Sequence, residues 1–194
     1  KALEFEAINS NIKAVHTNRG TFEPNTIVLA AGFVSPNLAK KIRVRVPIQA
    51  AKGYSLTVKR PRTCPDLPVH FHDSRVALTP FGPELMRIGG TLELTGNNRG
   101  ITSSRVKAIR KTPSQYLTGM EELEVMEIWH GMRPLSSDSL PIIGRPRKLE
   151  NLILATGHGM IGMSLGPISG KIVAEIALGR KTSLPLDVFR ADRF

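Results

Sequence analysis

The sequence predicts an α/β unit joined to an antiparallel sheet that packs with helices. Two short, mainly apolar runs, Thr26–Gly32 and Asn151–Thr156, are typical of strands buried on both faces, and a helix signal follows each run. Between them, apolar segments of strand length alternate with Pro, Gly and Asp turns, which is the pattern of an antiparallel sheet. We therefore expect residues 1–46 and 130–194 to form one domain and residues 47–129 to form another.

The N-terminal segment predicts a β-hairpin. Residues Glu4–His16 have strand character, Asn18–Gly20 is a turn signal, and Thr21–Glu23 resumes the strand. Two short runs around a trio that contains Gly are the usual signature of a hairpin. The chain starts at Lys1 and reads from there as the middle of a domain, so we expect that an N-terminal part of the protein is missing.

The buried run Thr26–Gly32 leads into a short helix. The run ends in small residues, which let a flat group approach the backbone closely. The helix is expected over Asn37–Lys41, with Ser35 as its cap and Pro36 in its first turn. The small residues at the strand end are Ala30, Ala31 and Gly32.

The middle of the chain predicts strands and one helix. Apolar residues recur at helical spacing in Thr102–Tyr116, and this helix is expected to end near Pro113. Gly89 and Gly90 lie inside an expected strand and indicate a bulge or a close contact. The expected strands are Gln49–Lys59, Ser74–Thr79, Glu84–Leu94 and Glu121–Trp129.

The end of the chain combines an arginine turn, a strand, a glycine-rich corner and a helix. The corner, Gly157–Gly162, matches G-x-G-x-x-G. A dinucleotide-binding unit would also need a second parallel strand with an acidic residue about 20 positions later, and none follows in the sequence. We therefore interpret the corner as an open helix N-terminus that favours a negatively charged partner. The helix is expected over Pro167–Leu178, because a proline disfavours an earlier start.

Arg133 is the main candidate for binding an anion. It precedes Pro134 just past an expected strand, and its guanidinium fork suits a carboxylate; a surface salt bridge is the alternative interpretation. His130 and His158 flank this stretch, each as a supporting neighbour rather than as an acid or base. A metal site is not expected, since the only cluster of ligand types in one loop is His70, His72 and Asp73.

The composition limits the classes of function. A net charge of +11 invites a nucleic-acid interpretation, but the basic residues are scattered and aromatic residues make up only 5%, too few for a base-stacking platform. We interpret the charge as a solvated face; the alternatives are attraction to anionic substrates, to lipid head groups or to acidic surface on a missing segment. Cys64 is the single cysteine, so an internal disulfide is excluded. The alternative class of function is a non-catalytic basic binding module, for nucleic acid or as a scaffold subunit.

A series of motifs identifies a family resemblance. The motifs are IVLAAG (Ile27–Gly32), Ser35-Pro36, KGYSLTV (Lys52–Val58), RIGGTLELTG (Arg87–Gly96), W-x-G-x-R-P (Trp129–Pro134), S-x-D-x-x-P-x-I-G (Ser136–Gly144), ATGHG (Ala155–Gly159) and the ending Phe189–Phe194. In this order they resemble the C-terminal portion of the D-amino-acid oxidase-like FAD-dependent oxidoreductases. Within that family the chain is most similar to the small-subunit type of D-amino-acid dehydrogenase.

The resemblance implies a fold and a reaction. It implies the C-terminal part of an FAD/NAD(P)-binding-type domain, a substrate-binding antiparallel sheet domain, and FAD as cofactor. The implied reaction oxidises a D-amino acid, or a related secondary amine of the glycine, sarcosine or proline type, to the imine and then the 2-oxo acid, with hydride passing to the flavin. The family's N-terminal G-x-G-x-x-G region is absent from this sequence, so the chain alone is expected to be inactive.

The resemblance also implies partners and a location. The expected partners are an amino acid or amine substrate and an electron acceptor, either quinone or oxygen, and no nucleic acid is expected. The expected location is cytoplasmic, with peripheral association with the inner membrane as a second option.

The resemblance further implies roles for single residues. Arg133 matches the arginine that grips the substrate carboxylate. The segment Gly157–Met163 matches the backbone that lines the flavin ring, and some relatives carry a tyrosine near the position of Ala77, which leaves the second substrate anchor open. The expected substrate-binding residues are Tyr54, Arg133 and His158. The expected cofactor-binding residues are Ala30, Ala31, Gly32, Gly131, Gly157, His158, Gly159, Met160, Ile161, Gly162 and Met163.

Overall fold

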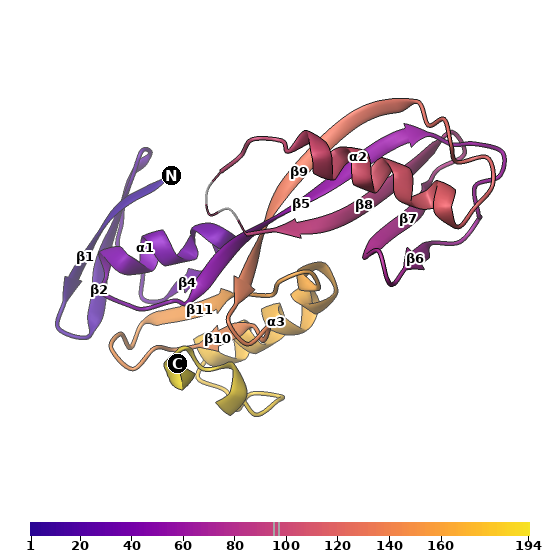
Figure 1. The fold of residues 1–194 in the computed structure, drawn as a ribbon. Helices are drawn as coiled ribbons and strands as arrows, with labels where there is room; N and C mark the ends of the chain where they lie inside the picture. The colour runs from indigo at the N-terminus through magenta and orange to yellow at the C-terminus, as the bar shows by residue number, and fades with distance from the viewer. Residues whose placement is uncertain (95, 97) are drawn as a thin grey trace. The chain divides into compact units, whose positions relative to one another are not determined.

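A computed structural model describes residues 1–94, 96 and 98–194 of the chain (Figure 1). The chain forms two compact units, which are described separately below. Unit 1 comprises Lys1–Gln49 and Arg133–Phe194, and unit 2 comprises Ala50–Met132. A parallel strand pair in one sheet and antiparallel pairing elsewhere confirm the predicted fold class. Thr95, within the Arg87–Gly96 motif, lies outside the described residues.

The first sheet of unit 1 is an antiparallel meander at the N-terminus. It contains β1 (Ala2–Ile8), β2 (Asn11–Thr17) and β3 (Gly20–Phe22) in that order. The prediction of one continuous strand over Glu4–His16 was wrong, because the chain turns between β1 and β2. Asn9 at this turn has a φ of 54°, a left-handed conformation that Asn adopts more readily than most residues.

The second sheet of unit 1 has the order β10-β11-β4. Its strands are β10 (Ile142–Gly144), β11 (Leu152–Thr156) and β4 (Ile27–Leu29), and β4 runs parallel to β11. The core of unit 1 is formed around this sheet by apolar side chains from several segments. Its buried members are Ile12, Leu29, Ala39, Ile42, Val44, Val46, Ile142, Leu149, Leu152 and Leu154.

Three helical segments follow the strands of unit 1. The 3-10 turn η1 (Gly32–Val34) runs directly into α1 (Ser35–Lys41), and α3 (Gly162–Ala177) begins at the last glycine of the corner. The prediction that Pro167 would delay the start of this last helix was wrong, since Pro167 lies inside it. A proline inside a helix removes one bond, here to the carbonyl of Met163, and the rest of the helix continues around that gap.

The C-terminal segment of unit 1 ends in two short 3-10 turns. These are η3 (Asp187–Phe189) and η4 (Ala191–Arg193). Figure 1 shows this segment, in yellow, beside β10 and α3.

Unit 2 is a five-stranded antiparallel sheet with one helix. The sheet order is β6-β7-β8-β5-β9. Its helix is α2 (Ser103–Lys111), followed by the 3-10 turn η2 (Thr112–Gln115), so the α-helix ends just before Pro113, as predicted. The strands are β5 (Ile48–Lys59), β6 (Val69–Phe71), β7 (Val76–Phe81), β8 (Leu85–Glu93) and β9 (Val125–Ser136).

Two parts of the unit 2 sheet differ from the prediction. His70 lies in β6 rather than in a loop, and its partner in β7 is Ala77. β9 extends to Ser136, so Arg133 lies inside a strand instead of following one. Buried and exposed side chains do not alternate clearly in β9, where most side chains are partly or fully exposed. For this reason the apolar pattern of the sequence placed the end of the strand too early.

The paired glycines of β8 have different surroundings. A Cβ added to Gly90 would lie 2.9 Å from Val76 Cγ2 and 3.2 Å from Ile109 Cγ1, so core packing requires a glycine there. A Cβ added to Gly89 would meet nothing closer than the Tyr54 carbonyl oxygen at 3.9 Å. The close contact predicted for this pair therefore exists at Gly90, where α2 packs on the sheet.

Candidate functional site

Unit 1 contains a glycine-lined pocket of about 410 Å³ at the ends of two parallel strands. The ends of β4 and β11 form one side, and the glycine corner with the first turns of α3 forms the other. Pockets of this size and position are common ligand sites in α/β sheets. The lining residues are Val28, Ala30, Gly32, Pro134, Ala155, Thr156, His158, Gly159, Gly162, Gly166, Ser169, Gly170 and Val173.

The glycine corner is held against the end of β9. The amide of Gly159 donates to the Pro134 carbonyl over 3.0 Å, and Leu135 forms an antiparallel bridge with His158. Gly159 has a φ of 57°, and a Cβ there would lie 3.3 Å from Leu135 Cδ2. The backbone conformation and the close approach of β9 together require a glycine at this position.

A chain of hydroxyl groups fixes the strand end on the other side of the pocket. Ser35 Oγ donates to Thr156 Oγ1 over 3.1 Å, and Thr156 Oγ1 donates to the Gly32 carbonyl over 3.1 Å. The prediction that Ser35 caps α1 was wrong, because the N-cap residue is Val34 and it makes no side-chain capping bond. The hydroxyl of Ser35 instead ties the start of α1 to the end of β11, and the Thr156 hydroxyl ties β11 to Gly32, after β4.

His158 is held in its neutral form at the mouth of the corner. Its Nε2 lies 2.9 Å from Ser169 Oγ on α3, and the residue is partly buried. Burial lowers the pKa of His158, because a charged imidazolium loses hydration in this position. His158 therefore connects the corner to α3 at neutral pH and carries no charge.

Arg133 has a buried donor without a partner. Its Nη1 is inaccessible to solvent and makes no hydrogen bond to any described residue. Burial lowers the pKa of the guanidinium, which nevertheless stays charged at neutral pH. An unsatisfied buried donor on a cation is costly, and the remedy is an anionic ligand with two oxygens. Arg133 directly precedes Pro134, which lines the glycine pocket.

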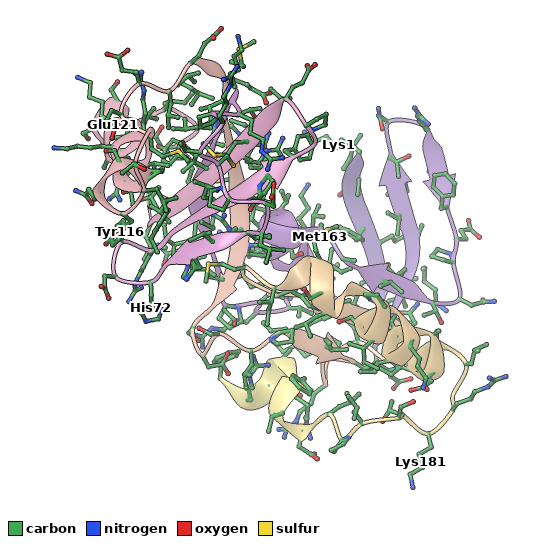
Figure 2. The ribbon with its side chains drawn as sticks, turned by 90° about the vertical axis from the view of Figure 1, so that its right-hand side faces the viewer. Lys1, His72, Tyr116, Glu121, Met163 and Lys181 are labelled. Atoms are coloured by element: carbon green, nitrogen blue, oxygen red, sulfur yellow. The ribbon has the colours of Figure 1, made fainter. Side chains whose placement is uncertain are left out.

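The structure brings part of the predicted cofactor set together. The predicted residues that line the pocket are Ala30, Gly32, His158, Gly159 and Gly162. Ala31, Gly157, Met160, Ile161 and Met163 do not line it. Met163 (94% exposed) and Met160 (72% exposed) present their side chains to solvent at the start of α3, where Figure 2 labels Met163.

Two predicted site residues belong to unit 2. Gly131 lies under the Trp129 ring, and a Cβ there would lie 2.2 Å from Trp129 Cη2. Tyr54 is 1% exposed, and its hydroxyl donates to Glu93 Oε2 over 2.6 Å. That hydroxyl is therefore already paired inside the unit, and the substrate role expected for Tyr54 stays a prediction.

Sequence reasoning found Gly162 but missed the rest of the pocket wall formed by α3: Gly166, Ser169, Gly170 and Val173. Gly162, Gly166 and Gly170 recur every four residues and lie on one face of this helix, together with Ser169. The spacing G-x-x-x-G-x-x-x-G was visible in the sequence and could have indicated a helix face open to close approach. It was missed because the helix was expected to start only at Pro167.

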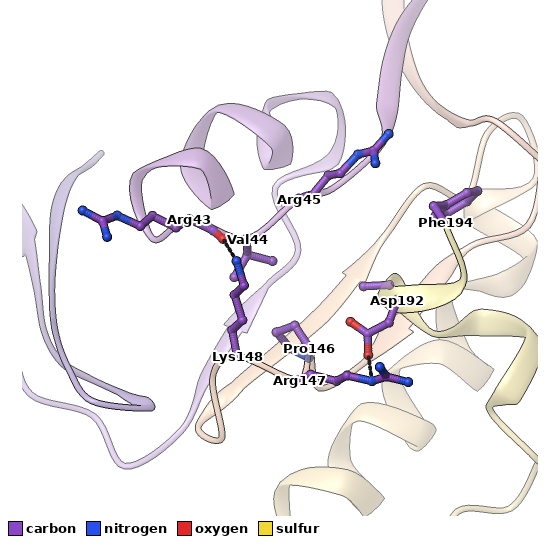
Figure 3. A pocket seen from close by; sticks show the side chains of 9 residues that line it. Arg43, Val44, Arg45, Pro146, Arg147, Lys148, Asp192 and Phe194 are labelled. Carbon is purple, nitrogen blue, oxygen red and sulfur yellow. Dashed lines mark hydrogen bonds and ion pairs between the residues drawn. The ribbon is translucent and has the colours of Figure 1, made fainter.

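A second pocket of unit 1, of about 300 Å³, is lined by cations (Figure 3). The segment Lys41–Val46 alternates exposed basic with buried apolar residues, so Arg43 and Arg45 face outward. Lys148 Nζ donates to the Arg43 carbonyl over 3.5 Å, and Arg147 pairs with Asp192 at 3.4 Å. We name the exposed residues around this pocket the basic face: Lys40, Lys41, Arg43, Arg45, Arg147 and Lys148.

The described residues offer neither a metal cluster nor a membrane-spanning helix. Across these residues, no group of three or more His, Cys, Asp or Glu side chains is arranged to hold a metal ion. His70 and His72 lie edge to face with ring centroids 6.0 Å apart. None of the helices in the described part of the chain combines the length and the apolarity that a membrane span requires.

A parallel strand pair, a glycine corner and an arginine with a free donor define an α/β cofactor-binding unit of the kind found in redox enzymes. Comparison with protein families agrees, since the model for FAD dependent oxidoreductases (DAO) matches residues 1–176. The chain belongs to this family. The family resemblance predicted from the motifs is confirmed, and so is FAD as the family's cofactor.

Curated relatives carry a more specific name. D-amino acid dehydrogenases from Neisseria gonorrhoeae and Helicobacter pylori are 35% and 34% identical to the chain over 185 and 178 residues. These alignments cover 94% and 91% of this chain but 44% and 43% of the relatives. The chain therefore spans less than half the length of the curated relatives that it matches.

Solved structures show the same fold. Glycine oxidase from Geobacillus kaustophilus superimposes with a TM-score of 0.91 at 23% identity, over 100% of this chain and 52% of that one. L-proline dehydrogenase from P. horikoshii gives a TM-score of 0.88 at 22% identity, over 100% and 53%. Nothing in these comparisons supports the alternative of a non-catalytic basic binding module.

Proposed function

We propose that the protein containing this chain is an FAD-dependent oxidoreductase that oxidises D-amino acids, or related secondary amines, to the imine and then the 2-oxo acid. The observation that carries the proposal is the buried Arg133 Nη1 without a partner, one residue before the wall of the glycine pocket. A guanidinium in this state binds a carboxylate better than any neutral group. The names of the curated relatives, D-amino acid dehydrogenases, support this substrate class.

The glycine pocket fits a flat cofactor. A Cβ added at Gly166 or Gly170 would meet no described atom within 4 Å, so packing within the chain does not require these glycines. Both line the pocket, where a Cβ would occupy space that a ligand needs. We propose that this wall, with Ala30, Gly32 and the corner from Gly157, faces the flavin.

The start of α3 offers charge stabilisation to that cofactor. The first helical bond is from the Leu165 amide to the Ile161 carbonyl, so the amides of Gly162 to Ser164 have no partner within the helix. Free amides and the helix dipole favour negative charge at this end. When bound, the flavin would supply the two-electron chemistry.

The side chains of this chain would position the substrate and keep charge away from the pocket. Arg133 would orient the amino acid through its carboxylate, which fixes the α-carbon relative to the pocket wall. His158 stays neutral beside Ser169, so it adds no positive charge that would compete with Arg133 for the carboxylate. Oxidation of a neutral amine needs no further side-chain base in this arrangement.

Replacing Arg133 tests the proposal. In the flavin-containing protein, Arg133→Lys is expected to raise KM for D-amino acids on the order of tenfold to a hundredfold, because a lysine cannot form the bidentate pair. Steady-state kinetics with several D-amino acids would measure this. The matched control is Arg147→Lys, the same change at an exposed arginine that pairs with Asp192 and does not line the glycine pocket. An unchanged KM in Arg133→Lys would contradict the carboxylate role.

We also propose that the protein associates peripherally with the inner membrane from the cytoplasmic side, which would give access to a quinone acceptor; oxygen is the other acceptor considered. The basic face supports this, because several exposed cations cluster beside Phe194, a combination suited to anionic head groups. Asp192 is the one carboxylate that lines this pocket, and it already pairs with Arg147 and Arg190.

Vesicle sedimentation tests the membrane proposal. The protein is expected to bind vesicles that contain phosphatidylglycerol and not vesicles of phosphatidylcholine alone. Arg43→Glu with Arg45→Glu should weaken that binding about tenfold or more, given about 1 kcal/mol per cation near an anionic surface. The control is the same double charge reversal at Lys59 and Arg62, which are exposed on unit 2. Equal binding to both vesicle types would contradict the proposal.

A further inference from the structure

The C-terminal segment is tied to the turn that follows β9. Arg193 Nε donates to Asp138 Oδ2 over 2.7 Å, and its Nη2 donates to Asp138 Oδ1 over 3.0 Å. The same Nη2 donates to the Leu140 carbonyl over 2.9 Å. Residues 55 positions apart in sequence therefore form a bidentate ion pair that also fixes the backbone of the turn.

The guanidinium of Arg193 uses most of its donors in this contact. Its Nη1 donates to the Arg190 carbonyl over 2.8 Å, so four of the five guanidinium N–H groups have partners within the chain. The Arg193 side chain is only 13% exposed, against 34% for Asp138. An arginine in this state holds structure together and has little capacity left for a ligand.

The turn itself is well ordered by its own side chains. Ser136 Oγ donates to the Leu140 carbonyl over 2.6 Å, and the Leu140 amide donates to Asp138 Oδ1 over 3.1 Å. Ser139 has a φ of 64°, a strained conformation for a serine. The Arg193 pair holds both Asp138 and Leu140, which flank this strained residue.

This turn is the continuation of the strand that carries Arg133. Ser136 is the last residue of β9, and between it and Arg133 lie only Pro134 and Leu135. These two residues hold the glycine corner, through the Gly159 amide and the bridge to His158. A shift of the turn would therefore reach both Arg133 and the pocket wall.

We propose that Asp138 and Arg193 are positioning residues, whose ion pair fixes the end of β9 and thereby sets Arg133 and the glycine corner for carboxylate binding. The inference rests on the proposed function for its carboxylate ligand. The ion pair does not touch the pocket, so its effect passes through the backbone of residues 134–140. The C-terminal segment is thus part of the substrate-binding apparatus rather than a surface tail.

The test compares two variants with a matched control in the flavin-containing protein. Asp138→Asn and Arg193→Lys each weaken the bidentate pair. Arg190→Gln removes a neighbouring charge whose ion pair is with Asp192 rather than with Asp138. The probes are KM and kcat for a D-amino acid, the Kd of benzoate read from the flavin spectrum, and hydrogen exchange at the Gly159 amide.

The positioning role predicts a specific pattern. Both variants should raise KM and the benzoate Kd on the order of tenfold with a smaller change in kcat, since misplacement of a binding group weakens orientation. The Gly159 amide should exchange faster in both variants, and Arg190→Gln should leave all values unchanged. The charge-swapped double variant Asp138→Arg with Arg193→Asp should recover part of the benzoate affinity.

Other outcomes would overturn the inference. A lowered melting temperature with unchanged KM, unchanged benzoate Kd and unchanged exchange at Gly159 would assign the pair a structural role only. If the unaltered protein neither oxidises D-amino acids nor binds benzoate, the proposed function fails. Hydrogen exchange at Gly159 still decides the inference in that case, because it reports whether the pair controls the corner.

Discussion

Lys52 is a fully buried cation within unit 2. It is 0% exposed, and its ammonium lies 3.5 Å from Glu93 Oε2 and donates to the carbonyls of Asn98 and Gly100. Glu93 also accepts from the Tyr54 hydroxyl at 2.6 Å and the Thr102 hydroxyl at 3.0 Å. These bonds, the one from Tyr54 first, lower the pKa of Glu93 and keep it charged.

Removing the cation from this network is expected to be costly. Lys52→Met should lower the free energy of unfolding by about 3–5 kcal/mol, because it removes the buried cation beside Glu93 and leaves only the partly exposed Arg105, at 3.8 Å, as a charge partner. Urea unfolding followed by circular dichroism would measure the change. The double variant Lys52→Met with Glu93→Leu should recover most of the loss, since no unpaired charge then stays buried.

The matched control lies on the same strand. Lys59 pairs with Glu124 at 3.7 Å, but both side chains are mostly exposed. Lys59→Met is therefore expected to change the stability by less than about 1 kcal/mol. A similar loss in the Lys52 and Lys59 variants would show that burial of the network contributes nothing.

Single residues were predictable where their chemistry depends on neighbours in sequence. Arg133 was singled out as an anion-binding candidate from its Gly-Met and Pro neighbours; its Nη1 is buried without a partner among the described residues, and its carboxylate role stays a prediction. Tyr54 illustrates the limit, because its hydroxyl pairs with Glu93, a residue 39 positions away. The sequence contains no local signal for that contact, and the substrate-binding role expected for Tyr54 stays a prediction.

Whole elements were predictable where one periodicity dominates. β5 and β11 fall within one residue of the expected ranges, since both are long or strongly apolar. The end of β9 was predicted too early because buried and exposed residues do not alternate clearly along it. β6 was predicted as a loop because it is only three residues long. The start of α3 was misplaced because a proline rule was applied locally, whereas the helix begins at Gly162 and contains Pro167.

At the scale of the whole molecule, contacts between distant segments are what local patterns could not supply. Asn151 Oδ1 accepts a hydrogen bond from the Ile12 amide over 2.9 Å, and Asn151 Nδ2 donates to the Ile12 carbonyl over 2.8 Å. The two residues are 139 positions apart in sequence. The Asp138–Arg193 pair is of the same kind. The glycine corner could be identified as a candidate site from the sequence. Its hydrogen-bonded attachment to β9 could be seen only in the structure.

The charge of the whole molecule sets its response to acid. The 27 Lys and Arg residues exceed the 16 Asp and Glu residues, so protonation of the carboxylates leaves a large uncompensated positive charge. Hydrogen bonds from Arg193 hold the pKa of Asp138 far below its usual value, and the pKa of Glu93 is lowered as well. Burial lowers the pKa of His158 in the same direction.

These shifts predict that stability falls as the pH is lowered from neutral. A group whose pKa is lowered in the folded state binds fewer protons there than in the unfolded chain, so the folded state loses stability as the pH falls below the unfolded value. His158 contributes below its ordinary pKa of 6.5, and Glu93 and Asp138 contribute below 4.5 and 3.8.

Urea midpoints from pH 7 to pH 3 would measure the decline, and Glu93→Gln and Asp138→Asn should each flatten its acidic part. Repeating the series at 1 M salt separates repulsion between positive charges from the effect of the lowered pKa values. Salt screens repulsion between exposed charges far more than it weakens buried pairs. Midpoints that stay constant or rise toward pH 3 would contradict the prediction.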